Sequence, residues 1–383
     1  GYTRNPPAGG LIMRTGVANL PLHGGHCPPW LFEKMVPLSR AIVETIVLEF
    51  GPDEVLERLA DPLWFQAFGC VLGFDWHSSG LTTTATGALK EALRPVARDL
   101  GIFVAGGKGA TSRKTPQEIQ EAGERYGLAL DLNRLVYTSR MTAKVDNTAI
   151  QDGFQLYHHV FIFTREGKWA VVQQGMNQEN HYARRYHWLG KSQQEFVEEP
   201  HSGILGPKAE KVMDLTAKDS RKAREVSAQL ACQKPEETLK EIGSLYRPKQ
   251  GVLPGFTMPK AHQVPNSAYL NRALLAAYER QPENFEELLA VDGVGSATIR
   301  ALALVSELVW GAPVSREDPV RYSFAHGGKD GFPYPVSDSQ YEQTIAVFES
   351  AIKSAKLGHS DKLRALKRLG KLQLGPKTTA TIN

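Results

Sequence analysis

Apolar residues follow a helical period in the first part of the chain and a strand period further on. They recur at helical spacing in residues 31–50 and again in residues 52–59. Residues 157–164 and 169–174 are instead rich in β-branched and aromatic side chains, and a Glu-Gly pair lies between them. Such an arrangement is typical of a β-hairpin. The pattern therefore predicts a helical region followed by a sheet.

A second helical region, at residues 284–311, is interrupted by a short turn. Apolar side chains lie at helical spacing in residues 285–289, and the Asp-Gly-Val-Gly sequence at 292–295 ends that helix. Ser296 begins another apolar-periodic helix, which runs to Trp310. The pattern predicts two helices joined by a tight bend.

These patterns together predict an α+β protein. Residues 1–205 form the expected N-terminal domain, a mixed α/β unit whose sheet contains the β-hairpin and which carries any chemistry. Residues 206–265 form a polar helical segment and a linker rich in Pro and Gly. Residues 266–383 form an all-helical domain that contains the two-helix motif.

Composition limits the class of protein. The chain has 383 residues and is 42% hydrophobic, which is enough for more than one buried core. No apolar run has membrane-spanning length and no signal-peptide pattern is found, so we expect a cytoplasmic protein without a membrane partner. Cys27, Cys70 and Cys232 are far apart and odd in number, which indicates neither a disulfide framework nor a thiolate zinc site.

Charge is informative only in its distribution. The net charge of +4 says little about partners. From Lys353 onward, however, eight Lys or Arg residues accompany a single acidic residue, Asp361. This tail is a candidate contact for a polyanion, and a solvated helix face is the simpler alternative.

The interrupted helix has the features of a phosphate-binding turn. Two glycines allow a tight bend, and the N–H groups that begin the second helix point outward at the positive end of its dipole. The candidate DNA-binding residues in this turn are Gly293, Val294, Gly295 and Ser296. An ordinary pair of helices, with glycines that only make the turn, is the alternative.

The same segment resembles the helix-hairpin-helix family of sequence-independent DNA-binding modules. The residues that match the family pattern are Val291, Gly293, Val294, Gly295 and Thr298. Ile299 stands where the family has a small alanine, which predicts looser packing of the two helices. The resemblance implies a DNA partner that is held by its backbone.

A second phosphate-binding candidate follows the predicted strand at residues 102–105. Glycines and cations are mixed in the next segment, and the candidate DNA-binding residues are Gly107, Lys108, Gly109, Arg113 and Lys114. The spacing differs from that of a Walker loop, so we expect no nucleotide cofactor. A basic solvent loop is the alternative. Lys329, in a His-Gly-Gly-Lys sequence, is added to the DNA-binding set.

Residues 137–188 hold the densest set of reactive side chains. Metal-assisted cleavage of a phosphodiester needs a divalent cation held by carboxylates or imidazoles, and cations that offset the charge on the phosphate. The candidate metal ligands, for Mg²⁺ or Mn²⁺, are Asp146, Asp152, His158 and His159. The candidate cations are Lys144, Arg184 and Arg185. Strand alternation places the two histidines on opposite faces of the sheet.

The function that we expect is therefore a metal-dependent nuclease in DNA repair. The second strand ends in Gln173 and Gln174 rather than in the Glu-x-Lys of restriction-type nucleases, so the chain is not assigned to that family. The alternative interpretation is that these residues form a hydrogen-bonded polar core beside a basic binding face.

Two other functions stay open. Asp318 follows the second glycine of the turn by 23 residues, a distance similar to that of the essential aspartate in helix-hairpin-helix DNA glycosylases. There it would stabilise positive charge on a sugar after a flipped base departs. The lyase lysine of some members is replaced by Ser296 and Ala297. The third possibility is a structural DNA-binding protein without catalysis.

Longer stretches of the chain resemble a single family. They include RTGVANLPLHGGHCPPWLFEKM, VAGGKGATSRKTP, AKVDNTAIQDGFQLYHH and DPVRYSFAHGGKDGFPYPV. These segments are similar to domain-of-unknown-function family 763, over nearly all residues from 14 to 369. The resemblance implies an intracellular protein and assigns no catalytic residue.

Overall fold

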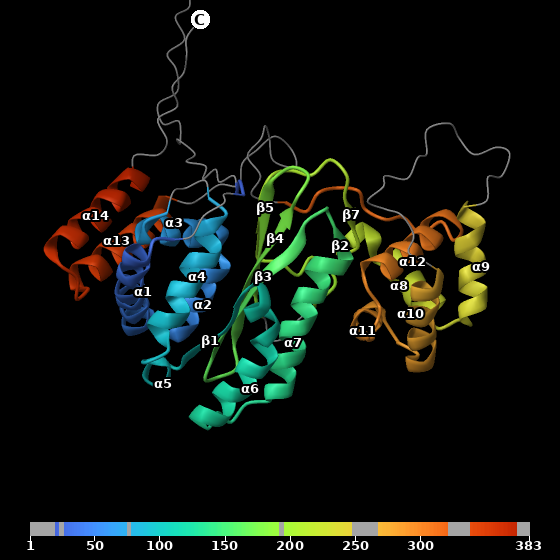
Figure 1. Ribbon diagram of the computed structural model, residues 1–383, viewed down its shortest axis with the longest axis horizontal. Helices are drawn as coiled ribbons and strands as arrows, with labels where there is room; N and C mark the ends of the chain where they lie inside the picture. The colour runs from blue at the N-terminus through green and yellow to red at the C-terminus, as the bar shows by residue number, and fades with distance from the viewer. Residues whose placement is uncertain are drawn as a thin grey trace, which may run out of the picture.

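A five-stranded antiparallel sheet lies at the centre of the chain (Figure 1). The computed structural model describes residues 20–22, 27–74, 78–190, 195–246, 267–320 and 338–373. The strands are β1 (Ile102–Lys108), β3 (Gln155–Thr164), β4 (Trp169–Asn177), β5 (Tyr182–Leu189) and β6 (Gly203–Leu205), in the order β1-β3-β4-β5-β6. Two short strands, β2 (Ile150–Gln151) and β7 (Met213–Asp214), form a separate antiparallel pair.

The β-hairpin predicted from the alternating segments is formed by β3 and β4. Gly167 adopts a φ of +80° in the connecting turn, and the backbone N–H of Thr164 donates to the carbonyl of Lys168 at 2.8 Å. The α+β fold class is confirmed.

One face of the sheet is covered by the first helices of the chain. These are α1 (Pro29–Phe50), α2 (Pro52–Ala60), α3 (Pro62–Leu72) and α4 (Gly80–Leu93), and the short α5 (Ala97–Leu100) leads into β1. Three of them begin with proline, whose missing N–H costs nothing at a helix start. The carboxylate of Asp61 accepts the N–H groups of Leu63 and Trp64 and so caps α3.

The last two helices pack on this same layer. They are α13 (Asp338–Ser354) and α14 (His359–Gln373), which contact α1 and α3 (Figure 1). The ring of Phe348 stacks on Trp64 with centroids 5.2 Å apart. One apolar core thus joins both ends of the described chain to the sheet.

The other face is covered by α6 (Thr115–Tyr126) and α7 (Leu132–Lys144). Beside them lies a group of five helices: α8 (Arg221–Ala231), α9 (Pro235–Tyr246), α10 (Ser267–Arg280), α11 (Phe285–Ala290) and α12 (Ser296–Leu308) (Figure 1). Short turns of helix link the elements: η1 (Gly109–Lys114), η2 (Val145–Ala149, a π-helix) and η3 (Lys218–Ser220). A second apolar core runs from the sheet through α7 into this group.

The division into residues 1–205, 206–265 and 266–383 stays a prediction. The packing shows one apolar core on each side of the sheet, and each core draws on segments from both sides of that division. No helix in the described ranges is long and apolar enough to cross a membrane.

Candidate functional site

Three pairs of identical residues place buried polar side chains on both faces of the sheet. The pairs are His158-His159 on β3, Gln173-Gln174 on β4 and Arg184-Arg185 on β5. Successive side chains of a strand point to opposite faces, so each pair is divided between the faces. The register aligns His158, Gln174 and Arg185 on the α4 side, while His159, Gln173 and Tyr186 align on the α7 side.

Asp146 is the centre of the polar cluster on the α7 side. Helix α7 ends at Lys144, and the wider π-turn of η2 directs the Asp146 carboxylate toward the sheet. Oδ2 accepts hydrogen bonds from Gln173 Nε2 at 2.5 Å and from Trp188 Nε1 at 2.9 Å, and His201 Nε2 lies 2.5 Å from Oδ1. Burial raises the pKa of Asp146, and the neighbouring His201 opposes this effect.

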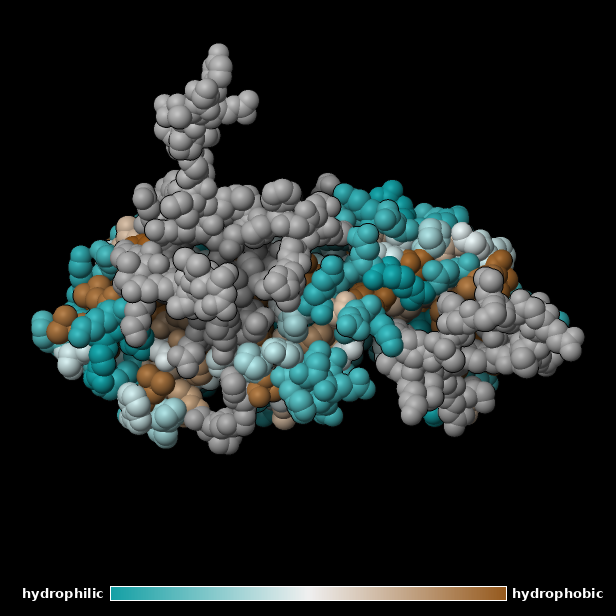
Figure 2. Space-filling model, turned by 90° about the horizontal axis from the view of Figure 1, so that it is seen from above, coloured by the Kyte–Doolittle hydropathy of each residue, from teal (hydrophilic) through white to brown (hydrophobic). Residues whose placement is uncertain are grey.

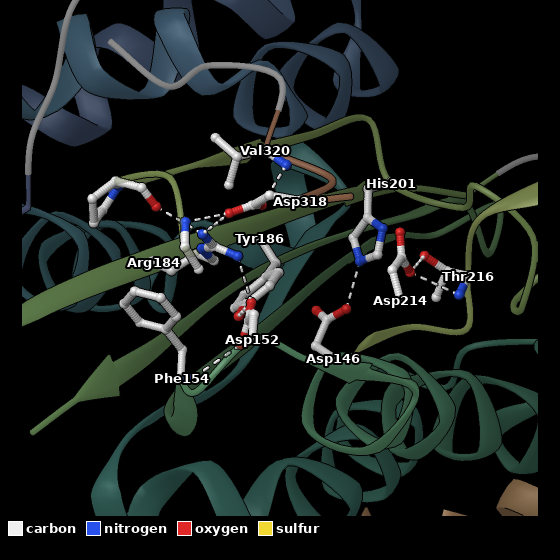
Figure 3. Close-up of polar contacts among 12 residues, drawn as sticks. Asp146, Asp152, Phe154, Arg184, Tyr186, His201, Asp214, Thr216, Asp318 and Val320 are labelled. Carbon is white, nitrogen blue, oxygen red and sulfur yellow. Dashed lines mark hydrogen bonds and ion pairs between the residues drawn. The ribbon is translucent and has the colours of Figure 1, made fainter. Parts of the chain in front are cut away.

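His201 lies between two carboxylates. Figure 3 shows the His201 ring between Asp146 and Asp214. The rings of His201 and Trp188 pack edge to face, with their centroids 4.5 Å apart. The Asp214 carboxylate accepts from the N–H of Thr216 at 2.8 Å and from its hydroxyl at 2.6 Å. Burial raises the pKa of Asp214, and the bonds from Thr216 and the charge of His201 moderate the rise.

Arg184 joins two further carboxylates (Figure 3). Its guanidinium donates to Asp152 and to Asp318, each at 2.7 Å, and all three side chains are fully buried or nearly so. The hydroxyl of Tyr186 also donates to Asp152, at 2.8 Å, and Arg184 lies over the Phe154 ring at 4.6 Å. Burial lowers the pKa of Arg184, but Asp152 and Asp318 outweigh burial and raise it above its ordinary value.

The α4 side carries a cation without a counter-ion. Arg185 is fully buried and donates to His187 Nε2 at 2.8 Å and to the hydroxyl of Thr82 at 3.2 Å. Its guanidinium lies over the ring of Phe65 at 4.6 Å. Within the described ranges no carboxylate forms an ion pair with Arg185. Burial lowers its pKa to about 9.

The hydrogen bonds of the buried histidines identify neutral rings. Gln173 Oε1 only accepts, so His159 Nδ1 donates to it at 2.7 Å, and its Nε2 lies 2.8 Å from the hydroxyl of Ser139. His187 likewise donates from Nδ1 to the Leu59 carbonyl at 2.9 Å and accepts at Nε2. Burial favours the neutral form of an imidazole, and burial lowers the pKa of His159 to about 4.

The turn between α11 and α12 adopts the predicted bend. Gly293 has a φ of +88°, which only glycine adopts without strain, and a Cβ there would meet no atom within 4 Å. The hydroxyl of Tyr269 on α10 donates to the Gly293 carbonyl at 3.0 Å, and a Cβ at Gly295 would lie 3.0 Å from that hydroxyl. Tyr269 therefore holds the turn from outside.

The turn is also joined to the polar cluster. Gln151 Nε2 donates to the carbonyl of Ser296 at 2.8 Å, and Gln151 Oε1 accepts from Arg300 at 2.7 Å. Gln151 is the last residue of β2, and Asp152 follows it directly. Gln151 thus holds the first residue of α12, and Asp152, the next residue after β2, pairs with Arg184.

The second phosphate-binding candidate forms η1, between β1 and α6. Lys108, Gly109, Arg113 and Lys114 are exposed, and Gly107 is half-buried. The hydroxyl of Thr115 donates to the Ser112 carbonyl at 2.7 Å and stabilises the turn itself. Lys329 lies outside the described residues.

A family model described as "Protein of unknown function (DUF763)" matches residues 16–336. The chain belongs to the DUF763 family. The match covers the sheet, the polar cluster and the turn between α11 and α12, and it ends before α13. No curated protein and no solved structure matches the chain.

The predicted metal ligands of the DUF763 protein do not meet at one point. His158 contacts Thr86 on one side of the sheet and His159 contacts Ser139 on the other. Asp146 and Asp152 are engaged by His201 and Arg184. Across the described part of the chain, no group of three or more His, Cys, Asp or Glu side chains is placed to hold a metal ion.

The predicted catalytic cations are placed differently from one another. Arg184 and Arg185 are fully buried on opposite faces, so neither reaches a phosphate at the surface. Lys144 is half-buried beside Asp292, and burial lowers its pKa while Asp292 opposes this effect. Asp318, the residue considered for a glycosylase, accepts from Arg184 and from the N–H groups of Ala209 and Val320. Its carboxylate serves as a counter-ion.

Sequence reasoning did not single out Asp214 or Tyr269. Asp214 lies in a polar stretch without a recognisable motif, and Tyr269 belongs to a different helix from the turn that it supports. Neither residue carries a local signal, because each acts through a contact between segments distant in sequence. His201 follows a Glu-Glu-Pro sequence, and only its residue type suggests a ligand.

Proposed function

We propose that this DUF763 protein binds DNA through the turn between α11 and α12, contacting the sugar-phosphate backbone and not the bases. The observation that carries the proposal is the accessibility of the turn. Asp292 and Gly293 are exposed and Gly295 and Ser296 are only half-buried, although both helices are packed into the core. The first N–H groups of a helix have no partner within it, so a phosphate oxygen is a suitable acceptor.

The support around the turn favours binding. Tyr269 holds the Gly293 carbonyl, and Gln151 holds the carbonyl of Ser296. A turn that is already fixed in the binding conformation loses little conformational freedom when a ligand arrives. The contacts of Tyr269 and Gln151 would therefore favour ligand binding as well as stabilise the helices.

Cations also lie beside the turn and in η1. Helix η2 packs against both β3 and α12, and η1 packs against β1 and β3. Lys144 lies beside the turn, while Lys108, Arg113 and Lys114 are in or next to η1. In the view from above, hydrophilic side chains predominate over the middle of the described surface (Figure 2). A polyanion bound at the turn would also meet Lys144.

The test compares two glycines with the same backbone strain. Gly293→Val should weaken binding to a fluorescent DNA duplex by about tenfold, because valine cannot hold the left-handed conformation of the turn. The matched control is Gly51→Val, since Gly51 has a φ of +92° and also meets no atom within 4 Å. Fluorescence anisotropy at several salt concentrations gives both the affinity and its salt dependence. Equal affinities for the two variants would contradict the proposal.

A metal-dependent nuclease is the second candidate. The observation in its favour is that three buried carboxylates, Asp146, Asp152 and Asp214, lie near His201 (Figure 3). Among the described residues, however, no three His, Cys, Asp or Glu side chains are placed to hold a metal ion. Mg²⁺ or Mn²⁺ would need to replace the hydrogen bonds that these carboxylates now accept, so the geometry supports binding better than cleavage.

Incubation of labelled DNA with Mg²⁺ or Mn²⁺ tests this candidate. Cleavage that both EDTA and Asp146→Asn abolish would support a nuclease. Cleavage that persists in EDTA, or intact DNA under all conditions, would reject it and leave DNA binding as the function.

A further inference from the structure

A small basic pocket lies between α1, α14 and the end of α3. These helices lie on the opposite side of the sheet from α11 and α12 (Figure 1). The volume of the pocket is ≈ 150 Å³. Its charged residues are Lys34, Asp361, Arg364 and Arg368. Three cations against one carboxylate leave an excess of positive charge.

The single carboxylate is already shared by two of the cations. Lys34 donates to both oxygens of Asp361, at 2.7 and 2.8 Å, and Arg364 donates to one of them at 2.6 Å. Arg368 forms no ion pair among the residues that the structure describes, and its buried Nε has no hydrogen-bond partner there. Among the described residues, the third cation therefore has no ion pair of its own.

The backbone makes room for Arg368. Arg368 Nη1 lies 2.4 Å from the point where a Cβ at residue 73 would be, and Gly73 has a φ of +130°. Any other residue at 73 would push the guanidinium away or strain the chain. Burial lowers the pKa of Arg368 and the neighbouring Arg364 lowers it further, so an added anion would relieve an unfavourable charge.

An exposed aromatic ring borders the pocket. Trp30 is 56% exposed and lies one helical turn before Lys34, on the same face of α1. Guanidinium groups bind phosphate oxygens by paired hydrogen bonds, and a flat exposed indole stacks on bases of any sequence. We infer that this pocket binds the phosphate of a nucleotide, with the base stacked on Trp30.

Isothermal titration with adenosine monophosphate, adenosine and inorganic phosphate tests this site. Adenosine monophosphate should bind more tightly than either fragment. Arg364→Gln should weaken its binding about tenfold, because one charged phosphate contact is lost. Trp30→Ala should weaken the binding of adenosine monophosphate but not that of phosphate.

The matched control is Lys367→Gln, which removes an exposed cation of the same helix outside the pocket. Equal effects of Arg364→Gln and Lys367→Gln, or adenosine monophosphate binding no more tightly than phosphate, would overturn the inference. The site does not depend on the proposed DNA-binding turn, and Gly293→Val should leave the titration unchanged.

A second arm identifies the source of the nucleotide. A short single strand with a 5′-phosphate competes with adenosine monophosphate if the pocket takes strand ends, whereas the same strand with a 5′-hydroxyl does not. A free mononucleotide is the ligand if neither strand competes. Both results support a nucleotide-phosphate pocket, and no binding of any of these probes would refute it.

Discussion

At the scale of single residues, the three dipeptides of the sheet place buried polar side chains on both of its faces. Alternation divides His158-His159 and Arg184-Arg185 between the two faces, and this division follows from the sequence. The partners do not follow from it. Ser139, Leu59 and Asp318 come from helices and loops far along the chain, so only the fold reveals which polar group meets which.

The Arg184 cluster leads to a prediction about stability. Arg184→Met would leave Asp152 and Asp318 buried without their cation, so the free energy of unfolding should fall by about 3 to 5 kcal/mol. Urea denaturation measures this change. The control is Arg316→Met, which breaks a more exposed pair with Glu307 and should cost at most about 1 kcal/mol. Similar losses of unfolding free energy for Arg184→Met and Arg316→Met would show that Arg184 does not stabilise the two buried carboxylates.

The buried histidines predict sensitivity to acid. Burial lowers the pKa of His158 to about 3, from an ordinary value of 6.5. Between those pH values the unfolded chain binds a proton that the folded chain does not, so acid favours unfolding. Each such histidine contributes up to about 1.4 kcal/mol per pH unit. Stability of the wild type should fall more steeply from pH 6.5 to 4.5 than that of His158→Gln, as measured by urea denaturation, and parallel curves would contradict the prediction.

At the scale of elements, the β-hairpin and the bend between α11 and α12 were predictable because their signals are local. Strand-forming residues flank a Glu-Gly turn in the first case, and two glycines lie between apolar-periodic helices in the second. The π-turn of η2 was not predictable. Its conformation depends on the Asp146 carboxylate, which meets Gln173, Trp188 and His201 from three later segments.

The turn also contains a charge that opposes its proposed partner. Asp292 is exposed next to Gly293, where it repels a phosphate. Asp292→Asn should therefore strengthen DNA binding by about two- to fivefold at low salt, and the gain should shrink as salt screens the charge. Fluorescence anisotropy with the same duplex measures both effects. Weaker binding by this variant would place the DNA elsewhere.

At the scale of the whole molecule, the α+β class and the order of helices and sheet follow from the periodicity of apolar residues. The positions of the last helices do not. Helices α13 and α14 are amphipathic, but nothing local indicates that they meet α1 and α3 rather than their neighbours in sequence. This packing turns Arg368 of the basic tail toward Gly73 and so creates a pocket that charge counting alone would not reveal.

The whole-molecule arrangement separates two predicted contacts with phosphate. Helices α11 and α12 lie beyond one face of the sheet, and α1, α3 and α14, which line the Arg368 pocket, lie beyond the other (Figure 1). Loss of one contact should leave the other intact, since no element is shared between them.

Hydrogen exchange of the backbone amides, with and without duplex DNA, tests the central claim most directly. If the start of α12 binds phosphate, the peptide that spans residues 291–299 should exchange more slowly when DNA is bound, and Gly293→Val should remove this protection. Unchanged exchange in that peptide, under conditions in which anisotropy shows the DNA to be bound, would contradict the account.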